Sequence, residues 1–191
     1  MKLKKSNTAL FIIDMQNDFV LPSSPVCIAG AQSTIPSIAK VLNKFRGNNS
    51  PIFHIIREYR EDGSDIENFR YKDFIEGQKY AIPYTQGCEI VKELKPKDDE
   101  YTIVKKRFSG FMGTELDSIL KRLNISNIII TGTQYPNCVR ATAFDAVALG
   151  YHVTIITDAT SASTDEIARA NIIDLENIDV CCIHSSALQP E

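Results

Sequence analysis

Cys138 is the residue of this sequence best suited to covalent chemistry, because of the segment that contains it. The segment starts with an apolar, β-branched run at residues 128–131, breaks at Gly132, and becomes an alanine-rich helix that ends at Gly150. Backbone N–H groups at a helix start lack intrahelical partners and carry partial positive charge. A thiol there is expected to ionise more easily, and the N–H groups can hold a developing oxyanion. The alternative is a small buried cysteine at a helix start.

Other reactive side chains also follow predicted strands directly. Asp14, Arg57, Lys105 and Cys138 each lie at or just past the carboxyl end of a strand. In a parallel α/β sheet, ligands bind beyond these strand ends, so the four side chains are expected at one edge. The three histidines are interpreted as structural: His54 lies in the middle of a strand, His152 lies at the start of a strand, and His184 lies near the C-terminus. A Cys–His pair is therefore not expected.

A thiol without a histidine needs another proton acceptor, and Asp14 is the candidate. A carboxyl group at the end of a buried strand loses solvation, which raises its pKa toward a useful range. Lys105 can stabilise negative charge on either Cys138 or Asp14. Each residue has a plainer alternative: Asp14 as the cap of the next turn, and Lys105 as a solvated charge in the run Lys105-Lys106-Arg107.

Alternating apolar and amphipathic stretches predict the elements that position these residues. Strands are expected at residues 8–13, 51–56, 101–104, 128–131, 151–156 and 179–183. Helices are expected at residues 31–45, 65–76, 113–123, 138–150 and 164–175. This alternation predicts an α/β fold with a parallel sheet and helices on both faces. Residues 77–100 show little periodicity and are either a loop that covers the site or a plain connector.

Length and composition limit the classes of protein. The 191 residues, 43% hydrophobic and 24% charged, predict a single domain over residues 1–191 with a sizeable core. A net charge of -3 with both signs spread along the chain indicates no nucleic-acid or membrane-surface partner. Five cysteines without zinc-like spacing, in a chain without a secretory signal, favour reduced thiols and a cytoplasmic location.

Four segments resemble the isochorismatase-like cysteine hydrolases, the superfamily of nicotinamidases, carbamoylsarcosine amidohydrolase-like enzymes and isochorismatases. They cover residues 9–19, 105–111, 132–139 and 142–153, and residues 86–94 also fit. The resemblance implies a three-layer α/β/α, Rossmann-like fold around a six-stranded parallel sheet. It also implies a homo-oligomer, a dimer or tetramer, that acts on a small-molecule substrate.

The same resemblance implies roles for particular residues. The catalytic triad is Asp14, Lys105 and Cys138, and Lys105 is chosen over Lys106 because the family lysine stands four residues before a serine, here Ser109. A non-proline cis peptide is expected at Thr133–Gln134. The oxyanion hole is expected from the backbone N–H groups of Gln134 and Cys138.

The chain also departs from the family pattern. Nicotinamidases carry an Asp-x-His arrangement after the second strand that holds a metal, whereas residues 57–63 here contain no histidine. We therefore expect no metal and no other cofactor, and we do not expect nicotinamide as the substrate. Tyr135 and Phe19 are candidate walls of the pocket. Arg57 or Arg60 is a candidate clamp for a substrate carboxylate, with an ordinary ion pair as the alternative.

Three functions are compatible with these observations. The first is a cysteine hydrolase that cleaves a non-peptide C–N bond of a small amide, carbamoyl or ureido compound through a thioester. The second is an isochorismatase-type hydrolase of an enol ether, with Asp14 as the acid. The third is a family member without turnover that acts as a binding protein. Cys138 favours the first function, because vinyl-ether cleavage needs no nucleophilic cysteine.

Overall fold

The protein is built on one six-stranded sheet in which every described strand pair is parallel. A computed structural model describes residues 7–24 and 26–188. The strand order is β3-β2-β1-β4-β5-β6. The strands are β1 (Thr8–Ile13), β2 (Ile52–Arg57), β3 (Tyr101–Lys105), β4 (Asn127–Thr133), β5 (His152–Ser161) and β6 (Cys181–Ile183). The predicted α/β fold and the parallel sheet are confirmed.

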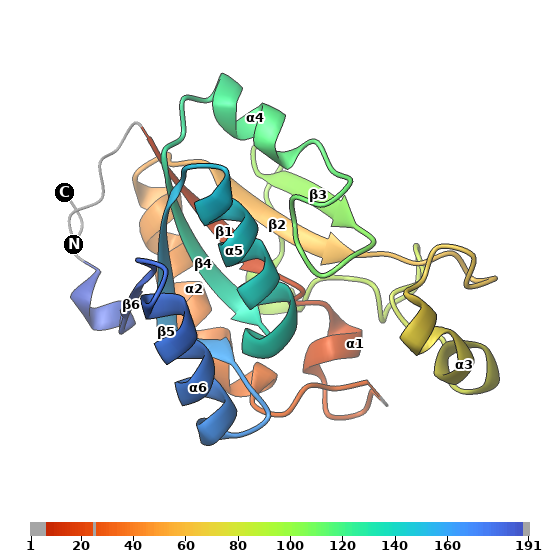
Figure 1. The fold of residues 1–191 in the computed structure, drawn as a ribbon. Coiled ribbons are helices and arrows are strands. Elements are labelled where there is room, and N and C mark those ends of the chain that lie inside the picture. The colour runs from red at the N-terminus through yellow and green to blue at the C-terminus, as the bar shows by residue number, and fades with distance from the viewer. Residues whose placement is uncertain (1–6, 25, 189–191) are drawn as a thin grey trace.

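Helices cover both faces of this sheet, which gives three layers (Figure 1). One face carries α4 (Leu116–Arg122), α5 (Arg140–Ala148) and α6 (Asp165–Glu176), and the other carries α2 (Ala31–Gly47). Two further helices, α1 (Asn17–Val20) and α3 (Asn68–Glu76), lie beyond the strand ends. Within residues 7–24 and 26–188, no helix is long and apolar enough to cross a membrane.

The central strand β1 shows why the sheet is buried on both faces. Phe11 and Ile13 pack with α4 and α5, while Leu10 and Ile12 pack with α2, because successive side chains of a strand point to opposite faces. All six residues of β1 are buried. Each fully buried apolar side chain of this size stabilises the fold by roughly 1.5–3 kcal/mol.

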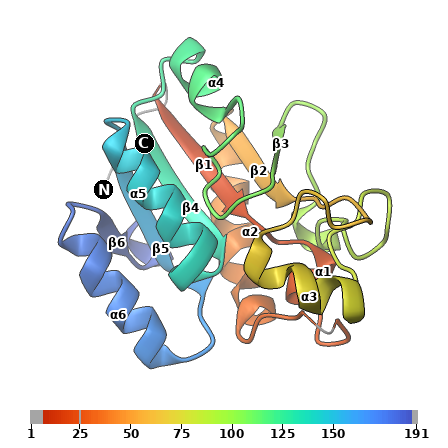
Figure 2. The ribbon, with the colours of Figure 1, turned by 45° about the vertical axis from the view of Figure 1, so that its right-hand side comes forward.

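The strand order reverses between β1 and β4, and this reversal opens the crevice that ligands use in such sheets. From β1 the chain passes outward to β2 and β3, and then returns to the other side of β1 to form β4. Asp14 directly follows β1, and Cys138 directly follows β4 and its turn. Figure 2 shows α1 and α3 next to this end of the sheet. Phe19 of α1 and Phe74 of α3 belong to one small core that closes this region.

Several elements differ from those expected. Helix α1 was not predicted, because four residues are too few to show a period. Strand β5 continues to Ser161, past the predicted end, with a register shift against β4 between Ile130 and Gly132. Residues 77–100 pack under α1 through Ile90, which bridges Gln16, and none of them lines the cavity described below. The segment therefore packs against the elements that carry the cavity wall, through Tyr80 and Ala81, and does not line the cavity itself.

Candidate active site

The turn that carries Cys138 is formed by the end of β4 and the start of α5. The peptide bond Thr133–Gln134 is cis, as the resemblance implied. Residues Tyr135–Val139 then form a single π-helical turn that leads directly into α5. The N–H groups of Asn137 and Val139 both donate to the Gln134 carbonyl, at 3.3 and 3.2 Å. Cys138 thus lies in the first turn of a continuous helical segment, as predicted.

Gly132 allows this turn to approach the end of β1. Its φ is +108°, and a Cβ atom there would lie 2.2 Å from the Ile13 carbonyl oxygen. That distance is shorter than any non-bonded contact, so only glycine fits at this position. The close approach of the two backbones brings the Cys138 turn beside Asp14, the residue after Ile13.

Lys105 joins the other two predicted catalytic side chains into one buried cluster. Its Nζ atom lies 2.8 Å from Asp14 Oδ2 and 3.5 Å from Cys138 Sγ. The Lys105 side chain is completely buried. Lys106 points away instead: its Nζ donates to the Glu58 carbonyl at 2.6 Å, and its side chain is 39% exposed. The structure therefore places Lys105, and not its neighbour, with Asp14 and Cys138.

Asp14 keeps one carboxylate oxygen unengaged. Oδ2 accepts from Lys105, whereas Oδ1 is buried and has no hydrogen-bond partner among the described residues. Such an unsatisfied buried oxygen is costly and calls for an explanation. A proton acceptor that must take a proton from Cys138 and later return it needs a free oxygen of this kind.

Arg57 adds a second cation to the thiol, which sequence reasoning did not foresee. Its Nη2 atom donates to Cys138 Sγ at 3.2 Å and to the Arg107 carbonyl at 3.1 Å. Its Nη1 atom donates to Glu67 Oε1 at 2.7 Å and to the Tyr59 hydroxyl. The guanidinium group is therefore fixed against the sulfur. Both hydrogens on each of its two terminal nitrogens are already used in these contacts. Arg57 therefore has no terminal N–H left to bind a substrate carboxylate, the role considered for it from the sequence.

The backbone of Arg57 is held by a side-chain amide at the end of β1. Gln16 accepts from the Arg57 N–H and donates to its carbonyl, both at 2.8 Å. This paired contact extends the pairing of β1 and β2 beyond the last strand residue. Gln16 fixes the backbone from which the Arg57 side chain extends, and Glu67 fixes its guanidinium group.

The thiol is harder to ionise than expected. Burial raises the pKa of Cys138, and the neighbouring Asp14 carboxylate raises it further, while Lys105 and Arg57 oppose the rise. The expectation of an easily ionised thiol is therefore wrong for the resting site, because desolvation outweighs the helix start and the two cations. A neutral resting thiol requires a base during reaction, and Asp14 with its free Oδ1 is placed to be one.

Glu67 remains ionised beside Arg57. Burial opposes its ionisation, but the hydrogen bond from Tyr59 and the charge of Arg57 outweigh this and lower the pKa of Glu67. The pKa of Arg57 is raised: burial alone would lower it, but Asp14, Cys138, Tyr59 and Glu67 oppose that effect. The two groups therefore form a lasting ion pair at the thiol.

A cavity of about 120 Å³ opens onto the thiol. Asp14, Arg57, Gln134 and Cys138 line it around the thiol. Phe19, Val26 and Ile28 add apolar surface, and Arg70 adds a second arginine. Phe19 lines this cavity as anticipated. Tyr135 does not: it packs in the core on the α5 side of the sheet, because the π turn directs it away from the crevice. Arg60 is exposed and does not line the cavity.

Sequence reasoning missed Glu67 and Arg70, which reach the site from the segment that ends in α3. Phe69 is an apolar residue of the helix predicted at residues 65–76, but its side chain is 65% exposed. The inward face instead contains Ile66, Arg70 and Phe74, which are four residues apart in sequence. This spacing was the available signal, since residues four apart share one face of a helix.

The residues present do not fit a divalent metal ion. Within the described part of the chain, no group of three or more His, Cys, Asp or Glu side chains is arranged to hold one. The last residue of β2, next to the place where the resemblance to nicotinamidases would put metal ligands, is Arg57, which contacts the thiol. Two arginines in a cavity this small repel a cation.

Comparison with known proteins gives the family. The Isochorismatase domain matches residues 8–185. A probable inactive nicotinamidase from Arabidopsis thaliana is 43% identical, over 91% of this chain and 90% of that protein. A ureidoacrylate amidohydrolase from Rhizobium rhizogenes is 29% identical, over 99% and 88%. A crystal structure of an isochorismatase family protein from Desulfovibrio vulgaris superposes with a TM-score of 0.92 at 47% identity, over 95% and 96%. With Asp14, Lys105 and Cys138 gathered at the switch point of this fold, the chain belongs to the isochorismatase family of hydrolases.

Proposed function

We propose that the protein is a cysteine hydrolase that cleaves the C–N bond of a small amide, carbamoyl or ureido compound. One observation carries the proposal: Lys105 Nζ contacts both Asp14 Oδ2 and Cys138 Sγ at a cavity, while Asp14 Oδ1 has no described partner. This arrangement supplies a nucleophile, a base with a free oxygen, and a cation between them.

The reaction begins when Asp14 takes the Cys138 proton and the sulfur attacks the substrate carbonyl carbon. The carbonyl electrons move to its oxygen, and the backbone N–H groups near Gln134 and Cys138 are proposed to hold that oxyanion. The tetrahedral intermediate then collapses, the C–N bond breaks, and Asp14 returns its proton to the departing nitrogen. A thioester and a free amine or ammonia result.

Hydrolysis of the thioester reuses the same base. Asp14, now ionised, takes a proton from a water molecule that attacks the thioester carbonyl. The C–S bond then breaks, and the proton returns to Cys138. Lys105 and Arg57 stabilise the negative sulfur whenever it forms, because both contact Sγ in the resting site.

Relatives support amide chemistry without fixing the substrate. The Rhizobium relative is an amidohydrolase of ureidoacrylate. The Arabidopsis relative is called a probable inactive nicotinamidase, which agrees with the missing Asp-x-His arrangement here. We therefore propose that nicotinamide is not the substrate.

The test is a screen of small amides, carbamoyl compounds and ureido acids for ammonia release, with Cys138→Ala as the blank. Pyruvate release from isochorismate is measured beside it. Ammonia release that depends on Cys138 supports the proposal. Pyruvate release that persists in Cys138→Ala supports the enol-ether alternative. If neither product forms and the thiol reacts no faster than free cysteine at neutral pH, the protein is a binding member of the family.

A further inference from the structure

The guanidinium group of Arg57 contacts the thiol with one terminal nitrogen and is held by the other. Its Nη2 atom donates to Cys138 Sγ at 3.2 Å and to the Arg107 carbonyl at 3.1 Å. Its Nη1 atom donates to Glu67 Oε1 at 2.7 Å and to the Tyr59 hydroxyl. Because a guanidinium group is planar and rigid, the partners of Nη1 fix the direction of Nη2. Glu67 and Tyr59 therefore direct Nη2 at the sulfur.

Glu67 is itself held on more than one side. Its Oε2 atom accepts from the Tyr59 hydroxyl and lies 3.7 Å from Arg70 Nε, an ion pair within one helical turn. The Glu67 side chain is 11% exposed, and Tyr59 is completely buried. Charge-assisted hydrogen bonds of this kind add geometric specificity as well as energy. The carboxylate is therefore a fixed support for Arg57.

The thiol alone cannot keep Arg57 in place. Burial and the Asp14 carboxylate raise the pKa of Cys138, so the resting sulfur is neutral and a weak hydrogen-bond acceptor. Asp14 is already bound to Lys105. A buried cation that waits beside a neutral sulfur needs an anion elsewhere on its guanidinium group, and Glu67 is that anion.

Glu67 acts on Arg57 and not on the cavity. It lies at the N-cap position of α3 and is not among the residues that line the cavity, whereas Arg57 is one of them. A substrate in the cavity would therefore meet Arg57 and Cys138 without contacting Glu67. Any influence of Glu67 on the chemistry must pass through the placement of Arg57.

We propose that Glu67, together with the Tyr59 hydroxyl, is a positioning residue that holds Arg57 against Cys138 Sγ, so that the cation is in place before the sulfur becomes negative. The inference rests on the proposed function for its effect on turnover. Its effect on the thiol itself needs no substrate, and the two can therefore be tested separately.

The direction of the effect separates positioning from simple electrostatics. Glu67 is an anion, so removing its charge while Arg57 stays in place would favour the thiolate and lower the pKa of Cys138. Removing Glu67 and releasing Arg57 would take a cation away from the sulfur and raise that pKa. The charged groups that face Sγ are Lys105 and Arg57, which favour the thiolate, and Asp14, which opposes it. Of these three, Arg57 is the one that Glu67 contacts in the described structure.

The test is iodoacetamide labelling of Cys138 as a function of pH, read at that residue by mass spectrometry, with ammonia release at neutral pH measured beside it. Glu67→Ala removes the support, and Glu67→Asp keeps the charge on a side chain that is one methylene shorter. Tyr59→Phe removes only the hydroxyl and keeps the buried ring. Glu76→Ala is the matched control, because Glu76 is a glutamate of the same helix, is 66% exposed and lies outside the cavity.

Glu67→Ala should move the labelling curve to higher pH by about one unit or more, the range for an opposite charge lost from contact. Turnover at neutral pH should fall about 10-fold, because one unit leaves a tenth of the thiolate. Glu67→Asp should recover part of both, Tyr59→Phe should give a smaller shift in the same direction, and Glu76→Ala should change neither. In Arg57→Met, adding Glu67→Ala should move the curve no further to higher pH, because Glu67 acts through Arg57.

A labelling curve that stays in place or moves to lower pH in Glu67→Ala would overturn the inference. A further shift to higher pH when Glu67→Ala is added to Arg57→Met would overturn it as well. If Glu67→Ala does not fold, Tyr59→Phe decides, and an unmoved curve in that variant refutes the positioning role. The expected shifts in a protein that releases ammonia from none of the compounds screened would keep the inference and refute the amide chemistry.

Discussion

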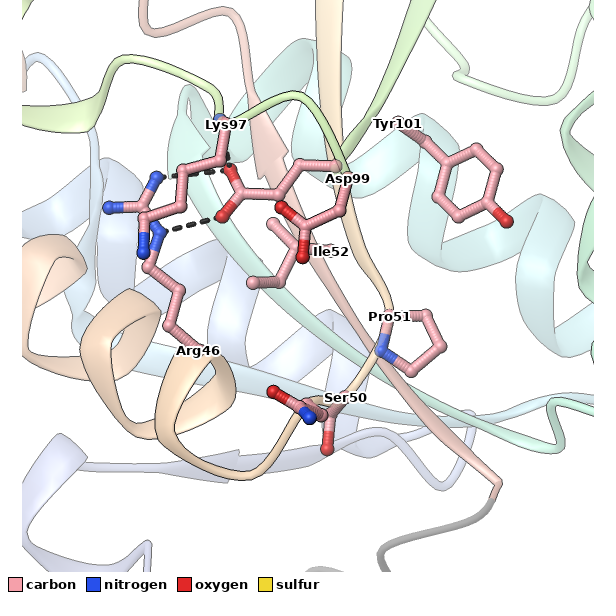
Figure 3. A pocket seen from close by; sticks show the side chains of 9 residues that line it. Arg46, Ser50, Pro51, Ile52, Lys97, Asp99 and Tyr101 are labelled. Atoms are coloured by element: carbon pink, nitrogen blue, oxygen red, sulfur yellow. Dashed lines mark hydrogen bonds and ion pairs between the residues drawn. The ribbon is translucent and has the colours of Figure 1, made fainter.

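The two ends of strands β2 and β3 both bury charged groups, but only one end leaves such groups unused at a cavity. At the amino end, Glu100 accepts from Arg46 at 2.6 Å and from the Lys97 N–H at 3.1 Å, and it lies 2.8 Å from His54 Nε2. Figure 3 shows Arg46 and Lys97 beside the cavity that opens there, which has a volume of about 280 Å³. His54 Nδ1 has no described partner, but His54 does not line that cavity.

The carboxyl end has the smaller cavity and the unused groups. Asp14 Oδ1 and Arg70 Nε are buried without described hydrogen-bond partners, and both residues line the cavity of about 120 Å³. Saturated groups such as Glu100 hold the fold together, whereas groups with free lone pairs or hydrogens remain available to a substrate. Buried polar atoms that lack a partner and belong to residues lining a cavity therefore identify the site better than cavity size does.

The largest effect is expected from removing the sulfur at the carboxyl end. Cys138→Ala should lower amide turnover by about 10³-fold or more, since the covalent route is lost. Thermal unfolding should change little, because alanine suits a helical turn. Activity and melting temperature are measured on the same preparation.

Cys88→Ala is the matched control, because Cys88 is also buried and lies on the same side of the molecule, against the Gln16 amide. Burial raises the pKa of Cys88 to about 11, so it is a poor nucleophile. The variant should keep its activity. Substantial hydrolysis by Cys138→Ala would remove the covalent mechanism.

The next effect concerns the lysine that joins the cluster. Lys105→Met should lower turnover by about 10²-fold or more and raise the pKa of Cys138 further, because Lys105 opposes the rise that burial causes. It should also destabilise the fold by roughly 3–5 kcal/mol, since Asp14 would stay buried without its cation. Lys106→Met, which alters a side chain outside the cluster, should leave turnover and the pKa of Cys138 unchanged.

The measurement is iodoacetamide labelling of Cys138 as a function of pH in both variants. If the labelling curve moves to higher pH in Lys105→Met and stays in place in Lys106→Met, Lys105 is the lysine that acts on Cys138. A second substitution, Asp14→Asn in Lys105→Met, should recover part of the lost stability, because it removes the unpaired charge. If Lys106→Met moves the labelling curve instead, the catalytic lysine has been assigned to the wrong position.

In a parallel α/β sheet, ligands bind beyond the carboxyl ends of the strands, and this rule accounts for the part of the site that the sequence could predict. Asp14, Arg57 and Lys105 come at the ends of buried strands, so a parallel sheet had to bring them together. The choice of Lys105 came from its spacing to Ser109 within the family resemblance, and alternation along β3 agrees with it. The cis bond at Thr133–Gln134 also came from the resemblance, and local sequence gives no signal for it.

The remaining features depend on contacts between segments far apart in sequence. Arg70 and Glu67 reach the cavity because Tyr80 joins α3 to α1: its ring contacts Phe74 on one and Phe19 on the other. Tyr135 was misplaced because a π turn rotates its side chain relative to an ordinary helix start. The direction of the Cys138 pKa depends on the depth of burial, which sequence does not give.

A smaller effect, on stability alone, is expected at the amino end. Burial opposes the ionisation of Glu100, but hydrogen bonds from Arg46 and His54 outweigh it and lower its pKa to about 2. A lowered folded-state pKa gives stability that is present above the unfolded-state pKa, near 4.5, and lost as pH falls toward 2. Glu100→Gln should lower the free energy of unfolding at pH 7 by about 2 kcal/mol, because Gln keeps only part of the bonding.

Denaturant unfolding of both proteins between pH 7 and pH 2 tests this. The stability difference should shrink as pH falls below about 4.5, and turnover per folded molecule should be unchanged. Glu93→Gln, at an exposed position in the 3-10 turn Lys92–Leu94, should match the parent protein throughout. A loss of turnover in Glu100→Gln would show that the amino end of the sheet affects the chemistry at the carboxyl end, and the assignment of Glu100 to stability alone would be wrong.

The smallest effect is expected from chelation, because the carboxyl end is electrostatically unsuited to a divalent ion. At an effective dielectric constant of 20, one positive charge repels a divalent ion 4 Å away by roughly 8 kcal/mol. Arg57 and Arg70 line this cavity, and Lys105 contacts two of its lining residues, Asp14 and Cys138. Asp14 and Glu67 are already paired with Lys105 and Arg57. Prolonged treatment with EDTA followed by its removal should therefore leave ammonia release unchanged, and metal analysis of the active protein should find less than one ion per chain. Activity that is lost with EDTA and restored by zinc, iron or manganese would show that Asp14 or Glu67 binds a metal ion in place of its side-chain cation.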